Sequence, residues 1–200
     1  VGGQVFYLND DVTMRSILSG SYLGKADGHA VYMKYPFTGI LSMLYRVFSG
    51  IPWLEVVFLG CILWSVIEIS MAVKRKIMGL CLSLLFVLPF CLYMHYTVVA
   101  ALLAGTAVFL ACEDRKGTKC VIFWLLAWSI RSQVAYLSLP FLGTALLMRL
   151  YQCPKICVKE YIKNTLKMLC FGGVALLLCG GLHYFCYASE EWQSFLRYNK

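Results

Sequence analysis

Two adjacent carboxylates, Asp10 and Asp11, stand near the start of the sequence, within a polar stretch that covers residues 1–35. Neighbouring carboxylates repel each other, so one of the two tends to hold its proton more tightly and can act as a general base. Together they could also hold a divalent cation such as Mg²⁺ or Mn²⁺, the one cofactor that the sequence suggests. The same pair fits a helix N-cap, because carboxylates are favoured at the positive end of the helix dipole. Both interpretations of the pair stay open.

Arg131 is the second residue whose type and place suggest chemistry, because it interrupts an apolar block that runs from residue 120 to 151. A guanidinium group in the hydrocarbon of a bilayer costs roughly 3 kcal/mol or more, so it is usually placed there for a partner. A lipid phosphate is a suitable partner, since the planar guanidinium can donate two parallel hydrogen bonds to it. Alternatively, Arg131 extends to the interface at a helix end, or pairs with Glu55 or Glu68.

Two more residues of the first stretch complete the candidate substrate-binding set. His29 follows Asp27 by two positions, so the two side chains could supply a base or a ligand, although a solvated loop histidine fits as well. Arg15 is included because it follows the acidic pair within the same short string. The sequence has no glycine-rich phosphate loop ending in Lys-Ser/Thr, no His-Glu-x-x-His and no Gly-x-Ser-x-Gly, so the activities that these motifs mark are not indicated.

The composition places these candidates on a membrane protein. Apolar residue types make up 60% of the 200 positions, only 14% are charged, and the mean hydropathy is +0.73. Soluble domains are usually about half apolar and about a quarter charged. The apolar residues come in blocks of about 16 to 21, close to the ~20 residues that a helix needs to cross a bilayer. Because the alternation of a β-barrel is missing, we predict an all-α bundle of transmembrane helices.

The positive charges fall between the apolar blocks. The formal net charge of +8 is therefore typical of cytoplasmic loops under the positive-inside rule, and it does not indicate a nucleic-acid partner. The last cluster repeats every four residues, which on a helix makes a basic stripe suited to anionic headgroups, so membrane lipid is an expected partner. The three clusters contain Lys74, Arg75 and Lys76; Arg115, Lys116 and Lys119; and Arg149, Lys155, Lys159, Lys163 and Lys167.

Taking these clusters as cytoplasmic predicts about six crossings of a bacterial cytoplasmic membrane. Residues 1–35 form a non-cytoplasmic first loop, 36–187 the transmembrane domain, and 188–200 the non-cytoplasmic start of a following segment, with the chain as a fragment of a longer protein. A single long helix over 120–151 would invert the last span and is the main alternative. The expected helices are a short interfacial one at 36–50 and spans at 53–73, 77–94, 96–112, 120–131, 134–151 and 168–187.

Several strings resemble type-C glycosyltransferase-like multispanning proteins (the GT-C superfamily) of Gram-positive bacteria. They are Asn-Asp-Asp-Val-Thr-Met-Arg at 9–15, Tyr-Thr-Val-Val-Ala-Ala at 96–101, Ile-Arg-Ser-Gln at 130–133, Leu-Pro-Phe at 139–141 and Glu-Trp-Gln-Ser-Phe-Leu-Arg-Tyr-Asn at 191–199. The resemblance implies a cell-envelope enzyme that uses a polyprenyl-phosphate-linked sugar donor. It also implies that Asp10 or Asp11 is the catalytic base or a metal ligand. Arg131, chosen above for its charge within an apolar block, would then hold the leaving phosphate.

Two other functions fit the same residues. A transporter or flippase-like carrier could line its pathway with Glu55, Glu68 and Arg131, since broken helices serve that purpose in transporters. A non-catalytic membrane assembly subunit would use Asp10 and Asp11 only as a helix cap. The sugar, the acceptor and the oligomeric state are not indicated by the sequence.

Overall fold

The computed structural model describes residues 9–22, 24–72, 76–92, 94–113, 117–154 and 157–193. Within these ranges the chain forms helices and no strand, which confirms the all-α fold. The helices are α1 (Asn9–Ser19), α2 (Tyr35–Val47), α3 (Trp53–Ala72), α4 (Lys76–Leu92), α5 (Tyr96–Cys112), α6 (Gly117–Ile130), α7 (Ser132–Gln152) and α8 (Val158–Cys186).

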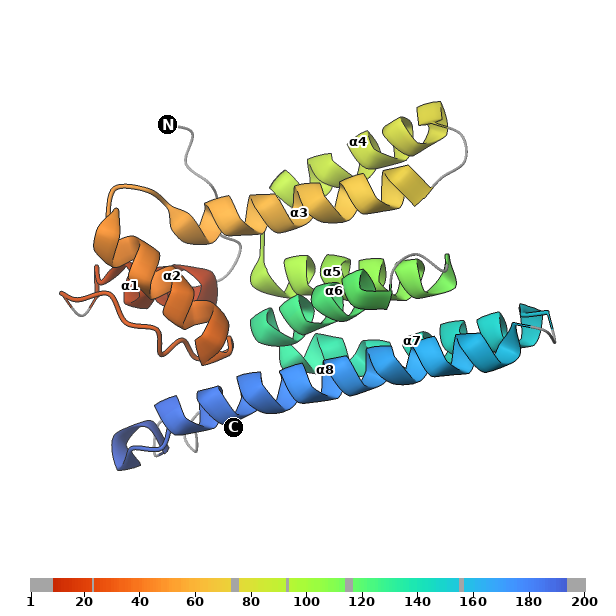
Figure 1. Cartoon of the computed structure of the whole chain (residues 1–200). Helices are drawn as coiled ribbons and strands as arrows, with labels where there is room; N and C mark the ends of the chain where they lie inside the picture. Colours follow the sequence, from red (N-terminus) through yellow and green to blue (C-terminus); the bar gives the residue numbers. More distant parts are fainter. Residues whose placement is uncertain are drawn as a thin grey trace.

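Helices α3 to α8 lie side by side with their axes roughly aligned, and α1 and α2 cover one end of this bundle (Figure 1). α3, α5 and α7 run away from that end, and α4, α6 and α8 return toward it. α5 is the centre of the bundle, because it packs against α3, α6 and α7. Its inner faces carry small buried residues, Ala100, Ala104 and Ala107, which let neighbouring helices approach closely.

Within the described residues, three helices are long and apolar enough to cross a membrane: α3, α7 and α8. α5 and α6 are apolar but shorter. α8 buries none of its residues against the rest of the chain, and large apolar side chains such as Leu177 and Leu178 are exposed along it. Such a surface suits lipid rather than water. The membrane class is therefore supported, while the count of six crossings remains a prediction.

The apolar block from 120 to 151 is broken at Arg131, as the split into two helices predicted. Arg131 has an extended backbone, with φ −148° and ψ 93°, between the end of α6 and the start of α7. α6 and α7 then pack against each other as a hairpin. The alternative of one long helix over this block is wrong.

Two basic segments differ from their expected form. α8 begins at Val158, ten residues before the predicted span, because the lysines at 159, 163 and 167 continue the helix instead of forming a loop. Lys119 lies within α6, where its ammonium group pairs with Glu68 of α3. The predicted cluster at 74–76 and the residues Arg115, Lys116 and Lys155 lie outside the described side chains. The helix ends that flank all three basic segments nevertheless share one end of the bundle, opposite α1 and α2 (Figure 1).

The first stretch is more ordered than the predicted loop, because α1 occupies residues 9–19 with both aspartates in its first turn. The helix stops at Gly20, which has a φ of 82°. A Cβ at this position would lie 2.5 Å from the backbone nitrogen of Ala26, so the chain can fold back against the end of α1 only with glycine there. Met14 and Leu18 of α1 are buried in the main core. α1 is thereby packed onto the end of the bundle.

Candidate functional site

Asp11 is buried between α1 and the start of α5, with 1% of its surface exposed. Its Oδ1 accepts a hydrogen bond from the backbone N–H of Tyr96 at 3.4 Å, and its Oδ2 lies 3.5 Å from Nε2 of His95. Burial raises the pKa of Asp11 above its ordinary value, and the charge of Asp10 adds to this, while His95 and the Tyr96 N–H act in the opposite direction. Asp11 therefore caps the N-terminus of α5, a different helix from the one in which it lies.

His95 is a site residue that sequence reasoning placed only at an interface. It precedes α5 as its N-cap, with an extended backbone, and its Nδ1 accepts from the backbone N–H of Thr97 at 3.2 Å. The neutral ring must then carry its proton on Nε2, the nitrogen that faces Asp11. Asp11 Oδ2 and His95 Nε2 are both buried and have no closer polar partner among the described residues. At 3.5 Å the two groups attract each other electrostatically without a regular hydrogen bond.

Arg131 lies at the same end of the bundle, against two tyrosine rings. Its Nη1 donates to the phenol oxygen of Tyr96 at 2.7 Å. Its guanidinium carbon stands 4.7 Å from the ring centre of Tyr32 and 5.1 Å from that of Tyr96, and the two rings stack with centres 5.8 Å apart. Such cation–π contacts contribute about 0.5 to 2 kcal/mol each. Among the described residues no carboxylate pairs with Arg131.

Tyr96 thus joins the two sequence-predicted groups. Its backbone N–H donates to Asp11, and its phenol oxygen accepts from Arg131. The carboxylate of Asp10 interacts with the same phenol through space, by its charge. We call Asp10, Asp11, Tyr32, His95, Tyr96 and Arg131 the Tyr96 cluster. Asp10 is half-buried, so it is the more accessible carboxylate of the pair. The cluster brings together a carboxylate that can accept a proton and a cation without an anionic partner.

A second cation stands beside the cluster at the end of α6. Lys34 donates its backbone N–H to the carbonyl of Ser129 at 2.7 Å, and its Nζ lies 5.6 Å from the ring centre of Trp128. Burial lowers the pKa of Lys34. The carbonyls at a helix C-terminus carry partial negative charge, which favours a cation such as Lys34 near the end of α6. In the described part of the chain Lys34 has no carboxylate partner either.

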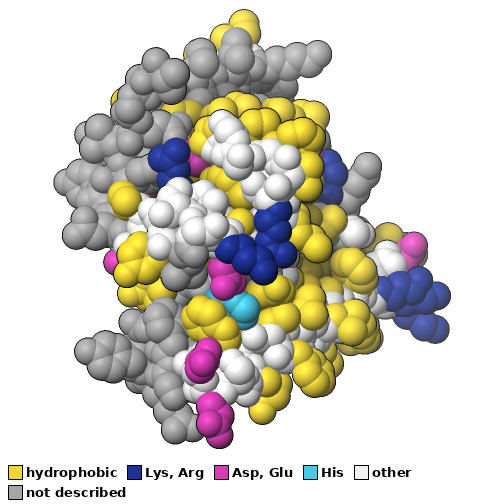
Figure 2. Space-filling model, turned by 90° about the vertical axis from the view of Figure 1, so that its left-hand side faces the viewer, with side chains coloured by type: hydrophobic (Ala, Val, Ile, Leu, Met, Phe, Trp, Pro, Cys, Tyr) yellow, Lys and Arg dark blue, Asp and Glu magenta, His cyan; other side chains and the backbone are white. Residues whose placement is uncertain are grey.

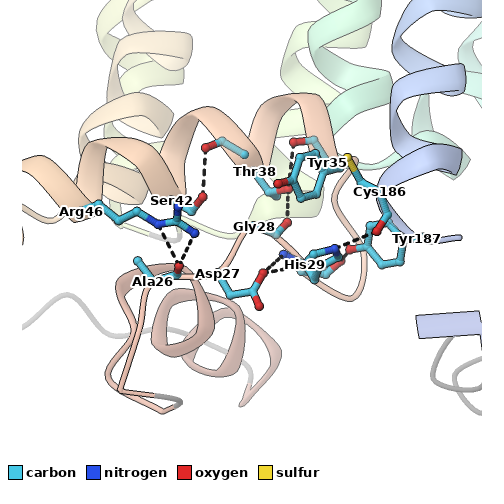
Figure 3. Close-up of polar contacts among 12 residues, drawn as sticks. Ala26, Asp27, Gly28, His29, Tyr35, Thr38, Ser42, Arg46, Cys186 and Tyr187 are labelled. Atoms are coloured by element: carbon cyan, nitrogen blue, oxygen red, sulfur yellow. Dashed lines mark hydrogen bonds and ion pairs between the residues drawn. The ribbon is translucent and has the colours of Figure 1, made fainter. Parts of the chain in front are cut away.

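His29 lies in a separate network at the same end, shown in Figure 3. Its Nδ1 is 2.5 Å from Oδ1 of Asp27, and its Nε2 is 2.9 Å from the carbonyl oxygen of Cys186. Burial pushes the pKa of Asp27 up, but the hydrogen bonds from His29 outweigh it, so the pKa lies below its ordinary value. The His29 ring also stacks on Trp192 at 4.2 Å. Both ring nitrogens face protein oxygens, so His29 fastens the first stretch to the end of α8.

Neighbouring contacts also hold the loop between α1 and α2 in place. Arg46 of α2 donates to the carbonyl of Ala26 (Figure 3). Tyr187 donates its phenol hydrogen to the carbonyl of Ala30 at 2.9 Å. Seen end-on, charged side chains of both signs and a histidine lie near the middle of this face, with hydrophobic side chains around them (Figure 2). The end of the bundle at α1 and α2 therefore carries charged side chains among hydrophobic ones.

The intramembrane acids have partners other than Arg131. Nε of Arg15 lies 3.0 Å from Oε1 of the buried Glu55, so this predicted substrate-binding residue ties α1 to α3. Glu68 accepts from Lys119 and from the indole of Trp64 at 3.3 Å. The proposed pairing of Arg131 with either acid is therefore not present. Each of the two carboxylates therefore has a cationic partner from another helix, Arg15 for Glu55 and Lys119 for Glu68.

A divalent cation would find few ligands here. Among the described residues no group of three His, Cys, Asp or Glu side chains is placed to hold a metal ion. Asp11 directs one oxygen to Tyr96 and the other to His95, which leaves Asp10 as the accessible ligand. Binding of Mg²⁺ or Mn²⁺ by Asp10 and Asp11 stays a prediction.

Neither a protein-family model, nor a curated protein, nor a solved structure matches this chain. The likeness to type-C glycosyltransferases thus rests on the strings quoted from the sequence.

Proposed function

We propose that the chain belongs to a membrane glycosyltransferase that takes a sugar from a polyprenyl-phosphate donor at the outer face of a bacterial cytoplasmic membrane. The observation that carries the proposal is the Tyr96 cluster, in which Tyr96 contacts both Asp11 and Arg131. Catalysis of sugar transfer needs a base near the acceptor hydroxyl and a positive charge near the leaving phosphate. The cluster offers both, from α1 and from the break between α6 and α7.

Arg131 is the group for the donor phosphate. Its guanidinium has no carboxylate partner among the described residues and is held in place by Tyr32 and Tyr96, so a phosphate can approach without first breaking an ion pair. Lys34, next to the end of α6, adds a second positive charge nearby. Arg131 and Lys34 would both stabilise the charge on the departing phosphate.

Asp10 is the better base of the pair. Asp11 is fully buried, with one oxygen on the α5 backbone and the other toward His95, whereas Asp10 is only half-buried. The acceptor hydroxyl would pass its proton to Asp10 while its oxygen bonds to the anomeric carbon. The bond from that carbon to the phosphate oxygen breaks at the same time, the anomeric centre inverts, and polyprenyl phosphate leaves toward Arg131. Asp11 acts as a positioning residue that fixes α1 on α5.

The side of the membrane follows from charge. The helix ends that flank the basic segments lie opposite the cluster (Figure 1), and basic segments are retained in the cytoplasm. This arrangement supports an outer-face site. The outer leaflet is also the one at which sugars already linked to polyprenyl phosphate would be presented to cell-envelope acceptors.

The test uses the full-length protein in membranes, supplied with polyprenyl-phosphate hexoses carrying a labelled sugar and with cell-envelope material as acceptor. Transfer of the labelled sugar to the acceptor is measured for wild type, Asp10→Asn and Arg131→Gln. Loss of a general base lowers turnover by about 10²- to 10⁴-fold, so Asp10→Asn should fall in that range. Arg131→Gln should mainly raise the donor KM.

The matched control is Glu190→Gln with Glu191→Gln, which neutralises another adjacent acidic pair with exposed side chains. This variant should keep wild-type turnover. Unchanged turnover in Asp10→Asn would refute the assignment of the base. Lipid flux across liposomes that depends on Glu68 or Arg131, and not on Asp10, would instead support a carrier.

A further inference from the structure

α8 is longer than a membrane span needs to be. It has 29 residues, which at about 1.5 Å per residue makes roughly 44 Å, whereas the hydrocarbon of a bilayer is about 30 Å thick. Residues 168–186 contain no Asp, Glu, Lys or Arg, so they are the part of the helix that suits hydrocarbon. The surplus length is therefore residues 158–167, at the end of the bundle opposite α1 and α2 (Figure 1). We call these residues the α8 extension.

The lysines of the α8 extension face away from the bundle. Lys159, Lys163 and Lys167 are exposed, and all three border one open hollow on the surface of α8. Residues two apart on a helix point in roughly opposite directions. Tyr161 and Thr165, two positions before and after Lys163, line the cavity between α8 and the helices α5, α6 and α7. The lysine surface is therefore separate from that cavity and is turned toward the surroundings of the protein.

The hollow carries a net positive charge. Of the described residues that border it, three are lysines and one, Glu160, is acidic. None of the three lysines forms an ion pair with a carboxylate in the part of the chain that the structure describes. Lysines four apart on a helix are neighbours, so their like charges repel each other. An anion placed between them would relieve this repulsion.

Apolar side chains are exposed directly beside the lysines. Ile162 is 43% exposed and Leu166 is 55% exposed. Residues three apart on a helix are neighbours, so Ile162 lies beside Lys159, and Leu166 lies beside Lys163. A water-borne polyanion would leave both apolar side chains in water. The boundary between headgroups and acyl chains suits both kinds of residue, because lysine can extend its ammonium group to the phosphates while the apolar side chains stay against hydrocarbon.

We infer that the α8 extension binds anionic phospholipids of the leaflet at this end of the bundle, with their phosphates beside Lys163 and Lys167. Ile162 and Leu166 then contact the acyl chains. The Tyr96 cluster lies at the opposite end of the bundle (Figure 1), so the inference does not depend on the proposed sugar transfer. Contact with acyl chains does not distinguish phospholipids that carry the same chains, so the charge of the headgroup determines which lipid is held.

The experiment is native mass spectrometry of the full-length protein, released from micelles that contain equal amounts of phosphatidylglycerol and phosphatidylcholine with the same acyl chains. Each lysine near a membrane surface contributes about five-fold to the binding of anionic lipid, so bound phosphatidylglycerol should exceed bound phosphatidylcholine at least about five-fold. Lys163→Gln and Lys167→Gln together should remove most of this preference. Lys163→Arg with Lys167→Arg keeps the charge and should keep the preference. Lys25→Gln, at an exposed lysine of the first stretch, should leave it unchanged.

Soluble glycerol phosphate distinguishes a lipid surface from a site for free phosphate. Added in excess, it should not displace the bound phosphatidylglycerol, because it cannot cover Ile162 and Leu166. Equal retention of the two phospholipids by wild type would overturn the inference. So would an unchanged preference in the variant with both glutamine substitutions, or complete displacement of phosphatidylglycerol by glycerol phosphate.

Discussion

Asp11 is predicted to support the fold by capping α5, and the two variants Asp11→Ala and Asp11→Asn separate this role from its charge. Alanine leaves the backbone N–H of Tyr96 without its acceptor, in a place where water has little access. Loss of a cap together with an unpaired buried N–H costs about 1 to 3 kcal/mol. Asparagine keeps an oxygen for Tyr96 and removes only the charge, so its cost should be clearly smaller.

The pH dependence of stability gives a second, independent readout of Asp11. Burial raises its pKa, so the folded state holds this proton more tightly than the unfolded chain does. The contribution of Asp11 to the free energy of unfolding therefore rises as the pH falls from its folded pKa toward the ordinary value of 3.8, and it is constant below that value. Asp27, whose pKa is lowered, acts in the other direction but only below 3.8. The two effects occupy different pH windows.

The assay is thermal unfolding in detergent micelles, followed by tryptophan fluorescence between about pH 4 and pH 7. At about 2 to 4 °C per kcal/mol for a chain of this size, Asp11→Ala should lower the Tm by about 2 to 12 °C. Wild type should gain stability on acidification, whereas Asp11→Asn should not. Glu190→Gln, at an exposed acid, should behave as wild type. An asparagine variant as unstable as the alanine variant, or a flat pH profile of the wild type, would refute the reasoning.

Three further predictions concern contacts elsewhere at the site and in the bundle. Tyr96→Phe keeps the stacked ring but removes the acceptor of Arg131, so donor KM should rise by several-fold with a stability loss of about 1 kcal/mol; an unchanged KM would show that this contact does not position Arg131. Glu68→Gln leaves the partly buried Lys119 without its counter-charge and should lower the free energy of unfolding by about 1 to 3 kcal/mol, measured by chemical denaturation. Adding Lys119→Gln should restore part of this loss. A double variant no more stable than the single one would argue against the pair. Gly20→Ala should lower the Tm by more than Gly24→Ala. Both residues have positive φ, but only at Gly20 would the Cβ meet backbone, 2.5 Å from the nitrogen of Ala26. Equal effects on the Tm would contradict this close approach.

Helix positions were largely readable from the sequence, because long apolar blocks in a membrane protein leave no alternative to helices. The break at Arg131 was predicted because the apolar block is too long for one span and a polar Arg-Ser-Gln run interrupts it. The start of α8 was missed. Its lysines repeat at helical spacing, but a cluster of positive charges between two apolar blocks is also typical of a cytoplasmic loop.

The partners of the charged residues could not be read from the sequence. Asp11 meets Tyr96, 85 positions further along the chain, and its neighbour His95, and nothing local signals that pairing. His95 looked like an ordinary interface residue because its N-cap role depends on the turn into α5. The sequence singled out Asp11 and Arg131 by residue type, and only the packing of α1 on α5 shows that one tyrosine contacts both.

The most direct measurement is covalent mapping with a polyprenyl phosphate that carries a photoreactive group next to the phosphate. After illumination of the full-length protein in membranes, the modified peptide is located by mass spectrometry. Label on Tyr32, Tyr96 or their immediate neighbours, lost in Arg131→Gln and kept in Glu190→Gln, is the result we expect. Label that survives the Arg131 substitution unchanged, or that lies only along the lysines of α8, would contradict an outer-face phosphate site at the Tyr96 cluster.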